Sequence, residues 1–208
     1  MELTYFGLSH LRLRGRDVLV VVDPPPSTLP GLGRLHADIV VRTEGMTVPA
    51  HLQPREGHPQ EVAGPGEFEV RGVRIQGISA GSTTIMRIEV DDVRVACLGR
   101  LDRQLTEEEV DRLGRVDVLA VPVGGVDALG AVPATKLINA IAPAIAVPVR
   151  YRSPGVEGTG DYDPLDKFAK EMGLVDGSWP VQPKLTLTGS MGAVEETRVV
   201  IVEPRATG

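Results

Sequence analysis

The chain of 208 residues contains a single cysteine, Cys97, and fewer basic than acidic residues. One cysteine excludes an intramolecular disulfide and indicates a reducing, cytoplasmic compartment. The formal net charge of −6 argues against non-specific binding to nucleic acid or to anionic membranes, because both require clustered lysine and arginine. The sequence has no apolar run long enough to span a membrane and no signal-peptide pattern at its beginning. We therefore expect a cytoplasmic protein without a nucleic-acid or membrane partner.

The first half of the chain has the pattern of a β-meander. Residues 64–66 form a Gly-Pro-Gly turn, and Arg71-Gly72 and Asp91-Asp92 supply the turn chemistry of two hairpins. Apolar and alternating runs predict strands at 3–6, 11–13, 18–22, 39–41, 67–70, 73–78, 84–90 and 93–98.

The second half alternates between helix and strand. Thr106 and Glu109 form a capping box that begins a helix ending at Gly114. Pro133 fits the first turn of a second helix through residue 142, and Pro164 is expected at the first helical position of a third helix that ends at Gly173. Strands are predicted at 116–123, 145–149, 185–187 and 198–202. This order predicts a mixed α/β fold with two mixed sheets between helices, a four-layer α/β/β/α sandwich.

Several short blocks carry a resemblance to a known family. They include Gly-Pro-Gly-Glu at 64–67, Cys-Leu-Gly at 97–99 and Pro-Val-Gly-Gly at 122–125. Together with blocks that extend to the C-terminus, they resemble the metallo-β-lactamase fold superfamily, and within it the UlaG-like branch of predicted zinc-dependent hydrolases. The resemblance implies one domain over residues 1–208 and a site where His and Asp side chains at strand ends bind two metal ions. Such a site lowers the pKa of a bound water to produce hydroxide.

The metal-ligand motifs of that family are degenerate in this chain. Its His-x-His-x-Asp-His pattern is replaced by Glu-Gly-Met-Thr-Val-Pro at 44–49, and its early His by Leu8. The loop at 79–82 lacks the His that the family has there. Arg100 stands where the family has the Asp of a Gly-Asp pair, and Arg150 stands where it has its last His ligand. We therefore expect no catalytic residue of the family type, no bound metal and no other cofactor.

Other residues offer an alternative metal site. Glu44, His51 and Asp102 could converge as a mononuclear zinc site, and Met46 is a soft donor, although a gap-filling apolar role is more common for methionine. Arg100 and Arg150 argue against this site because they place positive charge where a cation would bind. The chain has four histidines, at positions 10, 36, 51 and 58. His51 and His58 lack the close spacing of a paired site, and we interpret them as solvated loop residues. His10 follows the first strand and could face the pocket or have a surface or packing role.

The two arginines lead to two interpretations. In the favoured one, Arg100 and Arg150 pair with Glu44 or Asp102 and fill the vacated cavity with an ion-pair network. In the other, they bind a small anion such as a carboxylate or phosphate. Cys97, at the end of an apolar strand, is expected to be a buried and inert thiol.

The functional prediction is a pseudoenzyme, a hydrolase-like protein that acts by binding or assembly. Its partner would be a small anion or another protein, with a homo-oligomer also possible. The alternatives are a metal-dependent hydrolase with a relocated or atypical metal site, and a metal-free hydrolase that uses Glu44 and the arginines. The sequence names no substrate, because resemblance in fold does not transfer activity.

Overall fold

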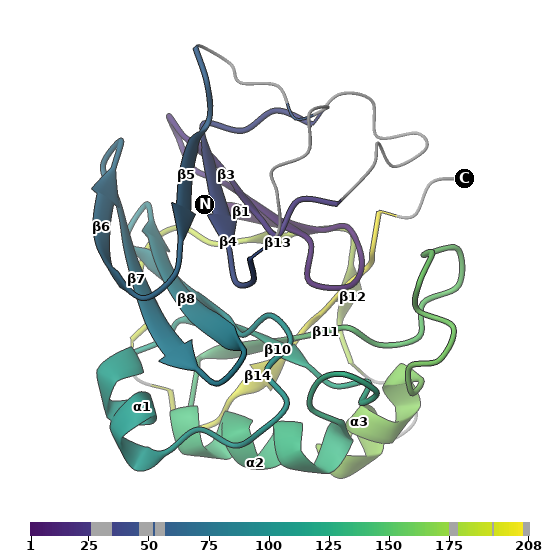
Figure 1. Ribbon diagram of the computed structural model, residues 1–208. Coiled ribbons are helices and arrows are strands. Elements are labelled where there is room, and N and C mark those ends of the chain that lie inside the picture. Colours follow the sequence, from purple (N-terminus) through teal and green to yellow (C-terminus); the bar gives the residue numbers. More distant parts are fainter. Residues whose placement is uncertain (26–34, 46–51, 53–56, 175–178, 193, 206–208) are drawn as a thin grey trace.

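The computed structural model describes the chain except for residues 26–34, 46–51, 53–56, 175–178, 193 and 206–208. Two β-sheets lie face to face, and the helices cover the outer face of one of them (Figure 1). Within the described ranges, no helix is long and apolar enough to cross a membrane.

The first sheet has six strands in the order β13-β1-β2-β3-β4-β5. Its strands β1 to β3 are antiparallel, and β4 and β5 run parallel to β3. Its members are β1 (Glu2–Tyr5), β2 (Leu11–Arg14), β3 (Leu19–Val22), β4 (Ile39–Arg42), β5 (Gln60–Ala63) and β13 (Leu185–Thr186). The sequence predicted five of these strands but not β5, because β5 buries only Val62 and therefore has no apolar run.

The second sheet has seven strands in the order β14-β11-β10-β9-β8-β7-β6. Both predicted hairpins are present, and their turn residues Arg71, Asp91 and Asp92 have positive φ angles, as the favoured two-residue hairpin turns require. The strands are β6 (Gly66–Val70), β7 (Val73–Ala80), β8 (Thr83–Val90), β9 (Val93–Cys97), β10 (Val118–Pro122), β11 (Ile145–Val149) and β14 (Arg198–Val199). The predicted strand at 198–202 divides, because β15 (Ile201–Val202) leaves this sheet and pairs with β12 (Val181–Gln182).

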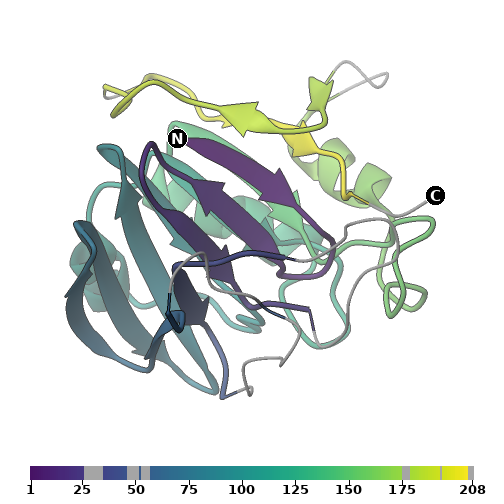
Figure 2. The same cartoon turned by 90° about the horizontal axis from the view of Figure 1, so that it is seen from above.

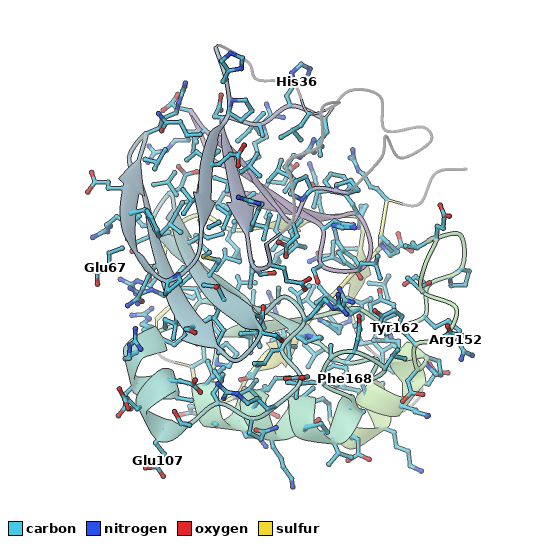
Figure 3. The ribbon with its side chains drawn as sticks, in the orientation of Figure 1. His36, Glu67, Glu107, Arg152, Tyr162 and Phe168 are labelled. Atoms are coloured by element: carbon cyan, nitrogen blue, oxygen red, sulfur yellow. The ribbon has the colours of Figure 1, made fainter. Side chains whose placement is uncertain are left out.

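Three helices lie on the outer face of the seven-stranded sheet: α1 (Glu107–Leu113), α2 (Ala131–Ile141) and α3 (Leu165–Glu171). The capping box of α1 is confirmed, since the Glu109 amide donates to Thr106 Oγ1 at 3.2 Å and the Thr106 amide donates to Glu109 Oε2 at 2.8 Å. Glu107 of α1 points away from the sheet (Figure 3).

The placement of Pro164 at the first helical position of α3 was wrong. Pro164 is the N-cap residue, with an extended ψ of 155°, and α3 begins at Leu165. The cause is a β-bridge between Pro164 and Arg152, which holds the proline backbone in an extended conformation. The proline ring fixes only φ, so the bridge decides ψ.

The main hydrophobic core draws on both sheets and on the inner faces of the helices. A smaller cluster lies on the outer face of the six-stranded sheet, where Leu35 and Leu52 pack on Phe6, Val21 and Val40. The mixed α/β fold with two facing sheets is as predicted (Figure 1, Figure 2). Among the described residues, helices cover only the outer face of the seven-stranded sheet. Loop residues cover the outer face of the six-stranded sheet.

The strand ends determine where a site can form. Strands β9, β10 and β11 are parallel neighbours, so their carboxyl ends meet at one edge of the seven-stranded sheet. The end of β4 reaches the same region, because the Thr84 amide of β8 donates to the Thr43 carbonyl at 2.8 Å. Loops from both sheets therefore meet at this edge.

The close packing of the β6–β7 hairpin is tested by Gly77→Ala. A Cβ at position 77 would lie 2.2 Å from the carbonyl oxygen of Gly64, so backbone would have to move. We expect a loss of about 1–3 kcal/mol in the free energy of unfolding, measured by chemical denaturation. Gly160→Ala is the control, since no atom lies within 4 Å of the added Cβ. Equal stability of the two variants would contradict the observed packing.

Candidate functional site

Five residues from separate loops gather where the two sheets meet. Leu8 follows β1, Glu44 follows β4, Arg100 follows β9, Asp127 follows β10 and Arg150 follows β11. The Leu8 carbonyl accepts a hydrogen bond of 3.1 Å from the Arg150 amide, which connects the two sheets through the backbone. The other four residues are connected by their charged side chains.

Asp127 is the centre of this group, because its carboxylate contacts two guanidinium groups. Arg150 Nη2 donates to Asp127 Oδ1 at 3.0 Å and to Oδ2 at 2.8 Å. Arg100 Nη2 lies 2.7 Å from Asp127 Oδ2 and Arg100 Nη1 lies 3.5 Å from Glu44 Oε2. We call Arg100, Asp127 and Arg150 the arginine–aspartate network. Its contacts are charge-assisted and short, the stronger class of protein hydrogen bond.

Arg150 is the buried member of the network, with 8% of its side chain exposed. It donates from Nη1 to Ser9 Oγ at 3.1 Å and from Nη2 to the Tyr162 hydroxyl at 2.5 Å. The Tyr162 hydroxyl in turn donates to Asp127 Oδ1 at 2.7 Å. Tyr162 belongs to the loop before α3 and is buried, whereas Arg152 of the same loop is exposed (Figure 3). A buried guanidinium is thereby paired with a carboxylate and two hydroxyl groups.

The network also affects proton affinities. Burial acts to raise the pKa of Asp127, but hydrogen bonds from Tyr162 and Arg150 outweigh it, and the pKa lies below its ordinary value. Burial raises the pKa of the Tyr162 phenol, and its hydrogen bond to Asp127 raises it further. Asp127 is therefore the anion of the group and Tyr162 a neutral donor.

Arg100 is the open member of the network, with 45% of its side chain exposed. It lines a pocket of about 440 Å³ whose walls come from the segments after β4, β7, β9 and β10. The polar side chains that line this pocket with Arg100 are Glu44, Ser82, Thr83, Asp102 and Asp127. We call it the Arg100 pocket.

A second set of buried polar groups supports the loop that begins at Thr43. Asp23 Oδ1 accepts from the Thr43 amide at 2.8 Å, and Asp23 Oδ2 accepts from Thr43 Oγ1 at 2.6 Å. His10 Nδ1 bonds to the Asp23 carbonyl oxygen. Burial lowers the pKa of His10 to about 4 and raises that of Asp23 to about 6. His10 is thus a neutral, buried residue, which agrees with the packing role that was one of its predicted alternatives.

The backbone at the site is strained. Leu8, Asp23, Val126 and Arg150 all have positive φ angles, between 45° and 64°. Val126 is the most unusual, because a β-branched residue rarely adopts this conformation. The residue is 71% exposed, so packing of its side chain in the core does not compensate for the strain. Such strain is retained where surrounding contacts hold the backbone in the strained conformation, and it is concentrated at functional sites.

Most of the residues singled out from the sequence come together. Leu8, Glu44, Arg100, Asp102 and Arg150 all lie at this site. The expected pairing is correct for Arg100 with Glu44, but Arg150 pairs with Asp127 and not with Glu44 or Asp102. Met46 and His51 lie outside the described residues, and the zinc site that would use His51 remains a hypothesis.

Asp127, Tyr162 and Ser9 were missed as partners. Asp127 could have been found, since it is the first carboxylate after Gly124-Gly125 and follows a strand parallel to the one that precedes Arg100. Tyr162 gave no such signal, because it is 35 residues from Asp127 and belongs to an irregular loop. Ser9 is 141 residues from Arg150.

The charges at this position do not fit a metal ion. Both oxygens of Asp127 already accept from Arg100, Arg150 or Tyr162, and the two guanidinium groups would repel a cation placed among them. Among the residues that the structure describes, no group of three His, Cys, Asp or Glu side chains is arranged to hold a metal. The residues present therefore form an ion-pair site.

Asp127→Asn tests the dependence of the site on one carboxylate. The substitution leaves Arg150 buried without an anionic partner, so we expect the free energy of unfolding to fall by about 3 kcal/mol. Asp163→Asn is the matched control, because Asp163 pairs with Lys167 at the surface and its loss should change stability by less than about 1 kcal/mol. Equal effects in urea denaturation would show that the network contributes no more than a surface pair.

His10→Gln tests the buried imidazole through the pH dependence of stability. Because the folded pKa of about 4 lies below the ordinary 6.5, the unfolded chain binds more protons between these values, and His10 makes the protein less stable as the pH falls. Glutamine does not titrate, so the stability of the variant relative to the native protein should rise by roughly 3 kcal/mol from pH 6.5 to 4. Asp23 is present in both proteins and its opposite slope cancels in the difference. A pH-independent difference would contradict this assignment.

Comparison with known proteins assigns the fold. The family model of the Beta-lactamase superfamily domain matches residues 2–150. A UPF0173 metal-dependent hydrolase of Archaeoglobus fulgidus is 33% identical over 98 residues, which are 47% of this chain and 42% of that protein. A UPF0173 protein of Pyrococcus furiosus is 26% identical over 203 residues, covering 83% of this chain and 90% of that protein.

A solved structure agrees with these sequence matches. The crystal structure of a metallo-β-lactamase superfamily protein from Thermotoga maritima superimposes with a TM-score of 0.80 at 25% identity, covering 98% of this chain and 99% of that one. The family model includes Leu8, Glu44, Arg100, Asp127 and Arg150 of the site but ends before Tyr162. The chain belongs to the family of the Beta-lactamase superfamily domain.

Proposed function

We propose that this protein is a non-catalytic member of its superfamily, a pseudo-hydrolase that binds a ligand at the Arg100 pocket. The observation that carries the proposal is the pair of guanidinium groups on Asp127, at the strand ends where the family resemblance implies metal ligands. A metal-dependent hydrolase needs His and carboxylate donors and an open coordination position for water. In this chain the corresponding positions hold Leu8, Glu44, Arg100 and Arg150.

The permanent charge of arginine supports the proposal. A guanidinium group stays protonated in proteins, so no change of pH within the physiological range releases Asp127 from Arg100 and Arg150. A histidine in place of either arginine could lose its proton and then coordinate a cation. The network therefore supplies fixed positive charge where a metal would supply it, but without a Lewis acid that activates water.

The nucleophilic side chains near the site, Cys97 and Ser9, are not activated. Cys97 is buried, and burial raises the pKa of its thiol, which keeps it protonated. Ser9 Oγ donates to the Gly99 carbonyl at 3.4 Å and accepts from Arg150, which cannot act as a base. His10 uses Nδ1 on the Asp23 carbonyl. None of these contacts is a nucleophile–base pair.

The alternative is a metal-dependent hydrolase with a relocated zinc site. It is favoured by the name of the Archaeoglobus fulgidus relative, a metal-dependent hydrolase. Glu44 and Asp102 line the Arg100 pocket and would be its carboxylate ligands. A metal-free hydrolase that uses Glu44 with the arginines is a further form of this alternative. Both are separated from the proposal by measuring bound metal and turnover.

Elemental analysis of protein purified without chelator, together with an assay of turnover, decides between the non-catalytic proposal and these hydrolase alternatives. We expect no stoichiometric zinc, manganese or iron, and no hydrolysis of chromogenic ester, phosphodiester or β-lactam substrates with added Zn²⁺ or Mn²⁺, because the guanidinium groups exclude a cation. Glu44→Gln and Asp102→Asn serve as matched variants. Stoichiometric metal that disappears in these variants would establish a relocated metal site, and turnover by metal-free protein would establish an enzyme. Either result would overturn the proposal.

A further inference from the structure

The charges around the Arg100 pocket are of both signs. Glu44, Asp102 and Asp127 line it with Arg100, and Arg150 lies behind Asp127. Two of the three carboxylates are balanced by the two guanidinium groups, which leaves one net negative charge. A ligand with only negative charge would meet three carboxylates, and a ligand with only positive charge would meet Arg100. The pocket is therefore matched to a molecule that carries both charges.

Arg100 can bind the carboxylate of a ligand through hydrogen bonds that its guanidinium group donates. Its guanidinium presents five N–H donors in a planar fork, and only Asp127 at 2.7 Å and Glu44 at 3.5 Å are near it among the described ion pairs. The Glu44 contact is long, and nearly half of the Arg100 side chain is exposed. An edge of the fork is thus available for two parallel hydrogen bonds to a carboxylate, the geometry that arginine binds best.

The carboxylates of Glu44 and Asp102 can accept hydrogen bonds from an ammonium group of a ligand. Asp102 is exposed and forms no salt bridge with any residue in the described part of the chain, although its charge acts on Arg103. Among the contacts of the described residues, Glu44 has only the long one with Arg100. An ammonium group has three donors and satisfies two carboxylates more fully than water does. Ser82 and Thr83 add hydroxyl groups to the same wall.

We propose that the Arg100 pocket binds a small zwitterion with one carboxylate and one ammonium group. The carboxylate pairs with Arg100, and the ammonium group lies between Glu44 and Asp102. Binding displaces the long Glu44–Arg100 contact, while the Arg100–Asp127 contact keeps the guanidinium in place. This assignment rests on the proposed function, because it requires a pocket without a metal ion.

The test is isothermal titration calorimetry of the full chain with three probes of the same carbon chain: γ-aminobutyrate, butyrate and butylamine. Glycine and β-alanine vary the separation of the two charges. We expect at least one zwitterion to bind saturably and more tightly than butyrate and butylamine. Arg100→Gln and Asp102→Asn should each weaken that binding by about tenfold, since each removes a charge-assisted hydrogen bond.

The control variant is Arg16→Gln, which removes an arginine that is 80% exposed and paired with Asp91. It should bind the zwitterion as the native protein does, and circular dichroism should show that all variants are folded. Equal binding of butyrate would identify an anion site, and equal binding of butylamine would identify a cation site. Either outcome, or no saturable binding of any zwitterion, would overturn the inference. The proposed function is judged separately, by metal content and turnover of the same preparation.

Discussion

The site depends on one carboxylate shared by two guanidinium groups. Asp127 neutralises Arg150, which is buried, and also holds Arg100, which is open to the pocket. A buried charge is tolerated only with a partner. Asp127, Ser9 and Tyr162 accept hydrogen bonds from the two terminal nitrogens of Arg150, whereas its buried Nε has no hydrogen-bond partner among the described residues. The loops after β1, β9 and β10 and the loop between β11 and α3 are joined through these contacts.

The network performs the structural part of what a metal ion performs at a strand-end site. A metal joins loops by accepting electron pairs from several segments, and here the same loops are joined by ion pairs and hydrogen bonds. The strained φ angles of Leu8, Val126 and Arg150 are held within this arrangement. The chemical consequence differs, because a guanidinium group donates hydrogen bonds and offers no open coordination position. The family fold is kept, and we propose that the chemistry of this site differs from that of a metal-dependent hydrolase.

Local patterns predicted the elements whose structure is decided locally. The two hairpins, the capping box of α1 and the strand at 145–149 were correct because turn residues, caps and apolar runs act over a few positions. β5 was missed because it is an edge strand held mainly by backbone pairing to β4. Pro164 was misplaced because a bridge to Arg152, 12 residues earlier, fixes its backbone.

The sequence by itself determined which side chains follow the strands. That Leu8, Glu44, Arg100 and Arg150 replace the metal ligands of the family stays a prediction from the resemblance. Only the tertiary structure decided which partners the arginines take. Asp127 is 23 residues from Arg150, and their contact requires the parallel register of β10 and β11 and the unusual backbone of Val126. Charge pairing over such separations depends on how the strands align, and no local pattern in the sequence specifies that alignment.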